Sequence, residues 1–241
     1  MKKLLFLIAL VPFLALSQNN NTAPLLTVTE ITVKQGHNEQ FMDAVKKWKA
    51  CYIENNGTDK WNFWRRVQGE GTFYIMTGLM DNWAEMDKED AAGKECSRII
   101  LNDILPHVEK TNYRMARSMP DRSRGPAQDM GLVWVTHYKV NNNDDFNEII
   151  DGVTAAVKAK EGSYRSFWYS KIGGPSENSD FFVSTPFRNF AELDIQRDTP
   201  AKIYREAIGD KKMEEMIKKW RAAVDKEWSY ILTLNKELSN Q

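Results

Sequence analysis

A six-residue motif that occurs twice constrains this chain most. It reads NWAEMD at residues 82–87 and NFAELD at residues 189–194. Other matched pairs follow the same order along the chain: FMDAVKKW at 41–48 with FNEIIDGV at 146–153, Phe63-Trp64 with Phe167-Trp168, and TFYIMT at 72–77 with DFFVST at 180–185. Several matches in one order indicate an internal duplication of about 105 residues, too long for a solenoid repeat.

Each copy has the pattern β-α-β-β-α-β. A β-rich run opens each copy, at 27–34 and at 132–140, and ends in turn residues before an amphipathic helix. Apolar residues at helical spacing mark a second helix in each copy. They are Cys96, Ile99, Ile100 and Ile104 in the first copy, and Met213, Met216, Ile217, Trp220, Ala223 and Val224 in the second. This order is typical of the α+β ferredoxin-like unit, which has both helices on one face of a four-stranded antiparallel sheet.

The predicted strands carry bulky apolar residues on both faces. In 61–67, Trp61 and Phe63 alternate with Trp64, and in 132–140, Val133 and Val135 alternate with Trp134. A half-exposed strand would alternate apolar with polar residues. Because the helices cover one face, we expect the sheet of the sister copy to cover the other. The sequence therefore predicts two tandem ferredoxin-like units packed sheet to sheet as an intramolecular, barrel-like pseudo-dimer.

The segment Val28–Phe41, VTEITVKQGHNEQF, resembles the first strand, glycine turn and helix entry of the dimeric α+β barrel superfamily. That superfamily includes antibiotic-biosynthesis-monooxygenase-like and NIPSNAP-like proteins. The proline that usually precedes the glycine is Gln35 here. The resemblance implies dimerisation through the sheet, which a fused tandem copy would achieve within one chain. It also implies a pocket between sheet and helices or inside the barrel.

The resemblance implies uses that range from cofactor-free oxygenation of aromatic substrates, through haem binding or breakdown, to roles without a known reaction. The haem-degrading branch has an Asn on strand one, a Trp on strand three and a His on the second helix. Here the first strand has no Asn, the third strands have no Trp, and His107 stands at the far end of the second helix. We therefore expect no cofactor.

The N-terminus has the three parts of a secretory signal peptide. Two lysines precede the apolar run 4–16. The segment Ala15-Leu16-Ser17 offers small residues at the spacing that signal peptidase reads, and a polar segment follows. We predict a signal peptide at 1–17, a flexible mature N-terminus at 18–24, repeat 1 at 25–118, a linker at 119–130 and repeat 2 at 131–241. The mature protein would be exported, periplasmic or extracellular, and free of the membrane.

Charge and cysteine content exclude some functions. Lys+Arg and Asp+Glu both number 33, so no basic excess favours a nucleic-acid partner. Cys51 and Cys96 match no metal motif. They are either small core residues or, since export permits oxidation and both lie on predicted helices over one sheet face, a disulfide. We expect no metal site, and further self-association is left open.

Two polar residues in the middle of strands are candidate catalytic groups. His137 occupies a position where the first copy has Thr32, and such a loss of symmetry is what a site in a duplicated protein would show. It is either a general base or an ordinary hydrogen-bonded strand histidine. Glu30 is either a catalytic carboxylate or the partner of a buried arginine, for which Arg65 is the candidate.

Aromatic residues on the strands predict a pocket for a flat apolar ligand. The candidate ligand-binding residues are Trp64, Trp168, Arg65, Trp134, Tyr138 and Tyr169. Trp64 and Trp168 are the leading pair because both copies keep a tryptophan there. The leading hypothesis is an exported protein that binds a small hydrophobic or aromatic molecule. The alternatives are a cofactor-independent oxygenase or isomerase that acts on an aromatic or polyketide-like substrate, and a structural module without a site.

Overall fold

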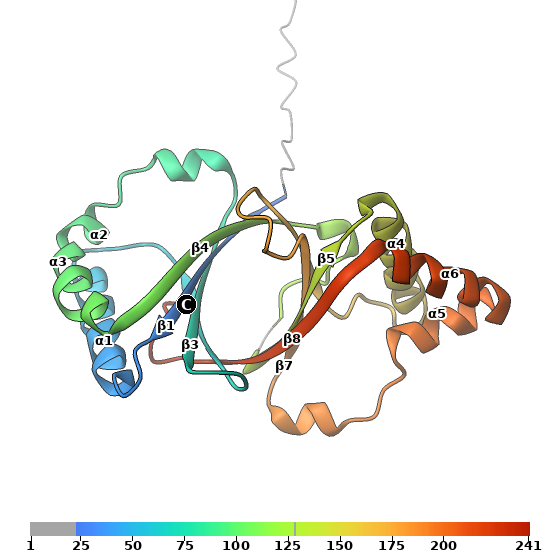
Figure 1. Ribbon diagram of the computed structural model, residues 1–241. Coiled ribbons are helices and arrows are strands. Elements are labelled where there is room, and N and C mark those ends of the chain that lie inside the picture. Colours follow the sequence, from blue (N-terminus) through green and yellow to red (C-terminus); the bar gives the residue numbers. More distant parts are fainter. Residues whose placement is uncertain (1–22, 128) are drawn as a thin grey trace, which may run out of the picture.

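The computed structural model describes residues 23–127 and 129–241 (Figure 1). The predicted signal peptide and most of the predicted flexible N-terminus lie outside the described residues. The first half contains β1 (Leu25–Val33), α1 (Asn38–Glu54), β2 (Trp61–Arg66), β3 (Thr72–Met80), the 3₁₀ helix η1 (Trp83–Asp87), α2 (Ala91–Glu95), α3 (Ser97–Ile99), the π-helix η2 (Ile100–Ile104), the 3₁₀ helix η3 (Leu105–His107) and β4 (Val108–Ser118).

A short 3₁₀ helix, η4 (Pro120–Arg122), lies in the connection to the second half. The second half contains β5 (Leu132–Val140), α4 (Asn143–Glu161), β6 (Phe167–Lys171), β7 (Phe181–Phe187), the 3₁₀ helix η5 (Phe190–Asp194), α5 (Pro200–Ile208), α6 (Asp210–Ala223) and β8 (Val224–Leu234). Within the described residues, every helix is too short or too polar to cross a membrane.

The eight strands form one closed antiparallel barrel in the order β1-β3-β2-β8-β5-β7-β6-β4. Each half contributes four adjacent strands, as the ferredoxin-like pattern predicts. Two seams join the halves: Trp64 of β2 pairs with Leu234 of β8, and Ala116 of β4 pairs with Lys171 of β6. The helices of the two halves lie outside the barrel on opposite sides (Figure 1). The predicted α+β pseudo-dimer is therefore confirmed, and backbone hydrogen bonds close it.

The repeated six-residue motif forms the same structure in both halves. Asn82 and Asn189 each have extended backbone and cap a 3₁₀ helix, with the side-chain oxygen accepting from Ala84 N–H and from Glu192 N–H respectively. An asparagine at this position satisfies an N–H group that would otherwise lack a partner. The motif repeats because each half ends its third strand with the same capped turn.

Strand alternation separates two kinds of core. In β1, Ile31 and Val33 point outward and pack beneath α1 against Phe41. Leu26 and Val28 point inward, where they pack inside the barrel with residues from the opposite wall such as Val135. Successive side chains of a strand face opposite sides, so each strand serves both cores.

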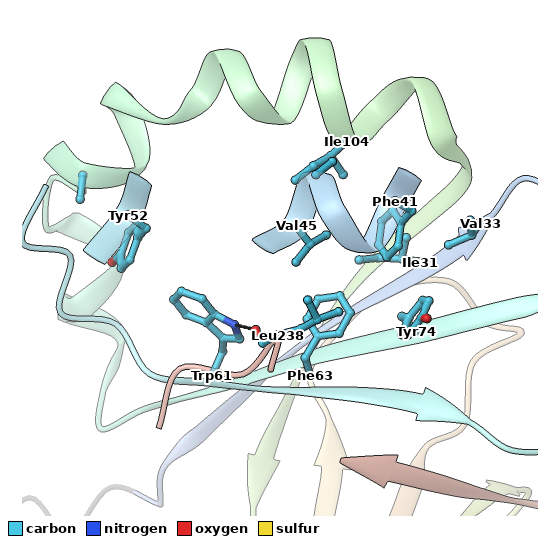
Figure 2. Packing of buried hydrophobic residues seen from close by; sticks show 12 residues of the cluster. Ile31, Val33, Phe41, Val45, Tyr52, Trp61, Phe63, Tyr74, Ile104 and Leu238 are labelled. Carbon is cyan, nitrogen blue, oxygen red and sulfur yellow. Dashed lines mark hydrogen bonds between the residues drawn. The ribbon is translucent and has the colours of Figure 1, made fainter. Parts of the chain in front are cut away.

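The C-terminal segment 235–241 crosses from the second half onto the first. Its Leu238 is fully buried beneath α1, and its carbonyl accepts a 2.8 Å hydrogen bond from the indole N–H of Trp61 (Figure 2). The backbone N–H of Phe63 donates to Ser239 Oγ at 2.8 Å. The segment continues along β2, where Trp61 forms an antiparallel bridge with Asn240. The second half therefore completes the core of the first.

A disulfide joins Cys51 of α1 to Cys96. The sequence left two alternatives open, small core residues or a disulfide, and the structure has the disulfide. Cys96 lies between α2 and α3, and the chain continues through the π-helix η2. The apolar pattern from Cys96 to Ile104 predicted one regular helix. The structure instead has short helical pieces around the cysteine that is tied to α1.

Candidate functional site

Two cavities lie on opposite faces of the second-half sheet. The first, of about 1150 Å³, is inside the barrel and is lined by Val135 and His137 of β5. The second, of about 590 Å³, lies between the same sheet and the helices α4, α5 and α6, and is lined by Thr136 and Tyr138. We call them the barrel cavity and the helix cavity. The helix cavity lies within the range of about 300–1,000 Å³ that is usual for small-molecule sites, and the barrel cavity is somewhat larger.

The helix cavity has an aromatic wall. Tyr138 and Trp168 stack with ring centroids 5.9 Å apart and an interplanar angle of 13°. Trp220 of α6 meets Tyr138 edge-on at 5.6 Å. Aliphatic side chains of α4 and α6 form the remaining wall, among them Ile149, Val153, Val157, Met213 and Met216. This surface suits a flat, apolar molecule.

Most polar groups around the helix cavity already have partners. Thr154 Oγ1 donates to the Ile150 carbonyl at 2.7 Å, and Tyr164 donates its hydroxyl hydrogen to the Asp121 carbonyl at 2.6 Å. Glu227 lies at the rim, and burial raises the pKa of its carboxyl group. Burial and the neighbouring Glu227 charge also raise the pKa of Tyr138. Tyr138 therefore keeps a neutral hydroxyl group that can donate a hydrogen bond to a ligand.

The helix cavity exists because two helix positions differ between the copies. Val153 and Val157 of α4 occupy the places that Trp48 and Tyr52 occupy in α1. In the first half, these two rings pack against Trp61, with centroids 4.9 Å and 5.4 Å from it, and Leu238 adds to the same core. The smaller valines leave the equivalent space open. A comparison of the two aligned helices could have predicted this.

The barrel cavity has a polar end formed by Glu30 and His137. Glu30 pairs with Arg114 of β4 and also accepts a 2.9 Å hydrogen bond from Asn112 Nδ2. His137 is 8% exposed, and its Nδ1 lies 3.1 Å from Ser179 Oγ. Its ring stacks on Trp228 at 5.3 Å and 13°.

His137 is held in its neutral form. Burial lowers its pKa to about 3, and the positive charge of Arg114 adds to this effect. A neutral imidazole in this state is a weak base at neutral pH, since an efficient general base has a pKa near the working pH. Its position supports a role in hydrogen bonding more than in proton abstraction.

We expect this buried neutral histidine to make the protein acid-sensitive. The unfolded chain takes up a proton at His137 below about pH 6.5, whereas the folded chain does so only near pH 3. Stability from this site is therefore present above pH 6.5 and is lost as the pH falls, by about 2 kcal/mol at pH 5. Urea unfolding at pH 7.5 and pH 5 measures it. A His137→Gln variant with the same pH dependence as the wild type would contradict the assignment.

The remaining walls of the barrel cavity are aromatic. Tyr169 stacks on Phe182 at 4.8 Å and 16°, and burial raises the pKa of its hydroxyl to about 12. The indole N–H of Trp64 donates to Thr77 Oγ1 at 3.0 Å. Arg66 lies over the rings of Phe73 and Tyr230, at 4.5 Å and 5.2 Å. The cavity therefore combines an apolar body with a polar end.

The predicted site residues are divided between these places. Glu30, His137, Trp64 and Tyr169 line the barrel cavity, and Tyr138 and Trp168 line the helix cavity. Arg65 and Trp134 line neither cavity, and both are exposed, Trp134 to 42%. The predicted Arg65–Glu30 ion pair is wrong, because Glu30 pairs with Arg114. The sequence could not show this, since β4 becomes the neighbour of β1 only in the folded sheet.

Trp64 and Trp168 face different cavities, although they occupy matching positions in the alignment of the two copies. Trp64 lies opposite Ile75 in the ladder and points into the barrel, whereas Trp168 lies opposite Val183 and points towards the helices. Phe167, one residue earlier, points into the barrel instead. A shift of one residue in a strand moves a side chain to the other face.

The described residues contain no group of three or more His, Cys, Asp or Glu side chains that could hold a metal ion. The residues that line the helix cavity include no histidine. A histidine-ligated haem, one of the uses that the resemblance implies, would therefore have no ligand there.

Solved structures with the same fold confirm the architecture. A candidate monooxygenase from Lactobacillus acidophilus NCFM is 11% identical, with a TM-score of 0.55 over 90% of this chain and 98% of its own. An anthrone oxidase-like protein is 10% identical, with a TM-score of 0.50 over 88% and 92%. A chlorite dismutase mutant from Candidatus Nitrospira defluvii is 8% identical, with a TM-score of 0.56 over 90% and 93%. No protein-family model and no curated protein matches the sequence.

Proposed function

We propose that this chain, a dimeric α+β barrel of the ferredoxin-like type built from a single polypeptide, is an exported protein that binds a small, flat, apolar molecule in its helix cavity. The observation that carries the proposal is the cavity of about 590 Å³, walled by Tyr138, Trp168 and Trp220. Export rests on the signal-peptide pattern at 1–17.

The two halves differ in how they fill the space between sheet and helices, and this difference supports a ligand site rather than a poorly packed core. The first half fills the equivalent space with two aromatic rings and Leu238. The second half keeps the aromatic wall of the sheet and opens the opposite wall with Val153 and Val157. An apolar cavity of this size costs stability when it is empty, because its lining atoms lose their contacts. A bound apolar molecule would restore them.

The test refills the cavity with the side chains of the first half. We expect N-phenyl-1-naphthylamine, an uncharged aromatic probe whose fluorescence rises in apolar surroundings, to bind the wild type saturably. Val153→Trp/Val157→Tyr should weaken its binding at least about tenfold, because the probe would lose the volume it occupies. Trp168→Leu should weaken it by a smaller factor. Fluorescence titration gives each dissociation constant.

Trp134→Phe is the matched control, because Trp134 lies on an exposed part of the same sheet outside both cavities. Its probe affinity should equal that of the wild type. Near- and far-ultraviolet circular dichroism establishes that each variant is folded. Probe binding that survives in the folded Val153→Trp/Val157→Tyr protein would refute the helix cavity as the site.

An enzymatic use of the same cavity rests on Glu227. An oxygenase or isomerase without a cofactor needs a group that takes a proton from the substrate, and a carboxyl group with a raised pKa at the cavity rim meets that need. Under this alternative, Glu227→Gln would abolish turnover of a bound aromatic substrate and leave its dissociation constant unchanged. Equal turnover in the variant would remove Glu227 from any catalytic role.

A further inference from the structure

The polar end of the barrel cavity holds two hydrogen-bond donors without partners. Arg114 Nε and Asn178 Nδ2 are buried, and neither has a hydrogen-bond partner among the described residues. Both residues line the barrel cavity. A buried donor that stays unpaired costs roughly 1–3 kcal/mol, so two of them at one cavity end indicate that something else supplies acceptors.

Strand contacts bring these donors to one place. The backbone N–H of Ile172 donates to the Met115 carbonyl at 2.9 Å, so the loop that follows β6 starts beside Arg114. That loop ends at Ser179, whose hydroxyl bonds His137. His137 thus lies at the same end as Asn178 and Arg114. All three residues line the barrel cavity.

The charges at this end favour an uncharged acceptor. Glu30 already pairs with Arg114, and both side chains are at least four-fifths buried. Glu177, next to Asn178, adds a second carboxylate to the cavity lining. Arg66 lies over two aromatic rings and donates to the Glu70 carbonyl. An added carboxylate would therefore meet a region where two acidic groups already balance two arginines.

The other two cations of the lining are engaged elsewhere. Lys60 Nζ donates to the Gln241 carbonyl at 3.1 Å, and the Arg124 guanidinium lies 5.9 Å from the centre of the Phe167 ring. The walls next to the donors are apolar or aromatic, with Trp228 stacked on His137 and Tyr169 stacked on Phe182. The ligand body should therefore be apolar as well.

We propose that the barrel cavity is a second ligand site, separate from the helix cavity, for an uncharged and mainly apolar molecule whose carbonyl oxygen accepts hydrogen bonds from Arg114 Nε and Asn178 Nδ2. The two sites lie on opposite faces of β5, since His137 faces one and Tyr138 the other. The second site does not depend on the first, because none of the donors lines the helix cavity.

The test uses three probes of nearly equal size: benzophenone, diphenylmethane and diphenylacetate. The first two differ only in a carbonyl group against a methylene group, and the third carries a carboxylate. Binding is measured by equilibrium dialysis in the Val153→Trp/Val157→Tyr background, whose helix cavity is filled. We expect benzophenone to bind about tenfold tighter than diphenylmethane, as one or two hydrogen bonds from buried donors would give. Diphenylacetate should bind more weakly than benzophenone.

Two variants test the donors. Asn178→Ala removes one donor, and Glu30→Gln/Arg114→Gln removes the other without leaving an unpaired charge. Each should reduce the preference for benzophenone over diphenylmethane, and Trp134→Phe should retain it. An equal affinity for benzophenone and diphenylmethane, or the tightest binding by diphenylacetate, would overturn the proposal.

The two sites can fail separately. If none of the three probes binds in the filled background, while N-phenyl-1-naphthylamine binds the wild type and not the filled variant, the barrel site is refuted and the helix-cavity function stands. If benzophenone binds tighter than diphenylmethane as expected, and N-phenyl-1-naphthylamine binds the wild type and the filled variant equally well, the barrel site stands and the helix-cavity function is refuted.

Discussion

Leu238→Ala should lower the free energy of unfolding by about 3 kcal/mol, because it removes a fully buried side chain from the core under α1. Truncation after Leu234 should cost more, since Trp61 Nε1 and the Phe63 backbone N–H would also lose their partners in the tail. Denaturant unfolding measures both effects.

Lys236→Ala is the control for the tail, because Lys236 is exposed in the same segment. Its free energy of unfolding should match that of the wild type. Near-ultraviolet circular dichroism adds a local measurement, since the indole of Trp61 bonds the Leu238 carbonyl directly (Figure 2). A truncated protein as stable as the full chain would show that the first half does not need the tail.

Glu30→Gln should lower the free energy of unfolding by about 3 kcal/mol, because it leaves the Arg114 guanidinium mostly buried without its carboxylate. Glu30→Gln/Arg114→Gln should recover most of the loss, since no unpaired charge remains. Urea unfolding at pH 7.5 gives the free energy of unfolding of both variants. Comparing them separates the effect of the unpaired charge from the effect of the changed side-chain shape.

The exposed pair Arg205–Asp210 is the control for this prediction. Asp210→Asn should leave the stability nearly unchanged, because solvent screens surface ion pairs. If Glu30→Gln alone proves neutral, water reaches Arg114 freely, and the charge argument for the barrel site loses its basis.

The fold could be predicted from the sequence because it depends on local hydrophobic patterns, and these patterns occur in both copies. Amphipathic spacing from Phe41 and from Phe146 predicted the two long helices α1 and α4, and both residues are fully buried. Bulky residues on both faces of the strands predicted that the sister sheet would cover the inner face. The closed barrel meets that requirement.

The candidate sites were harder to predict, because they depend on strand register and on contacts between distant segments. A one-residue difference in register separated Trp64 from Trp168, and no local pattern records such a shift. Arg114 became the partner of Glu30 because β4 lies beside β1.

The burial of Leu238 in the other half follows from the path of the tail after β8. The segment after β4 makes the matching crossing in the first copy: the Trp168 backbone N–H donates to Ser123 Oγ at 2.8 Å, as that of Phe63 donates to Ser239 Oγ. These contacts join segments that are far apart in the sequence, so no local pattern predicts them.

The two seams of the barrel, β2 with β8 and β4 with β6, have a consequence for assembly. In a barrel made of two separate chains, these contacts form by association and weaken as the protein is diluted. Here the segment between β4 and β5 tethers the partners, and a short tether holds them at an effective concentration in the millimolar range. The unfolding midpoint should therefore be independent of protein concentration, and both cavities should persist at any dilution.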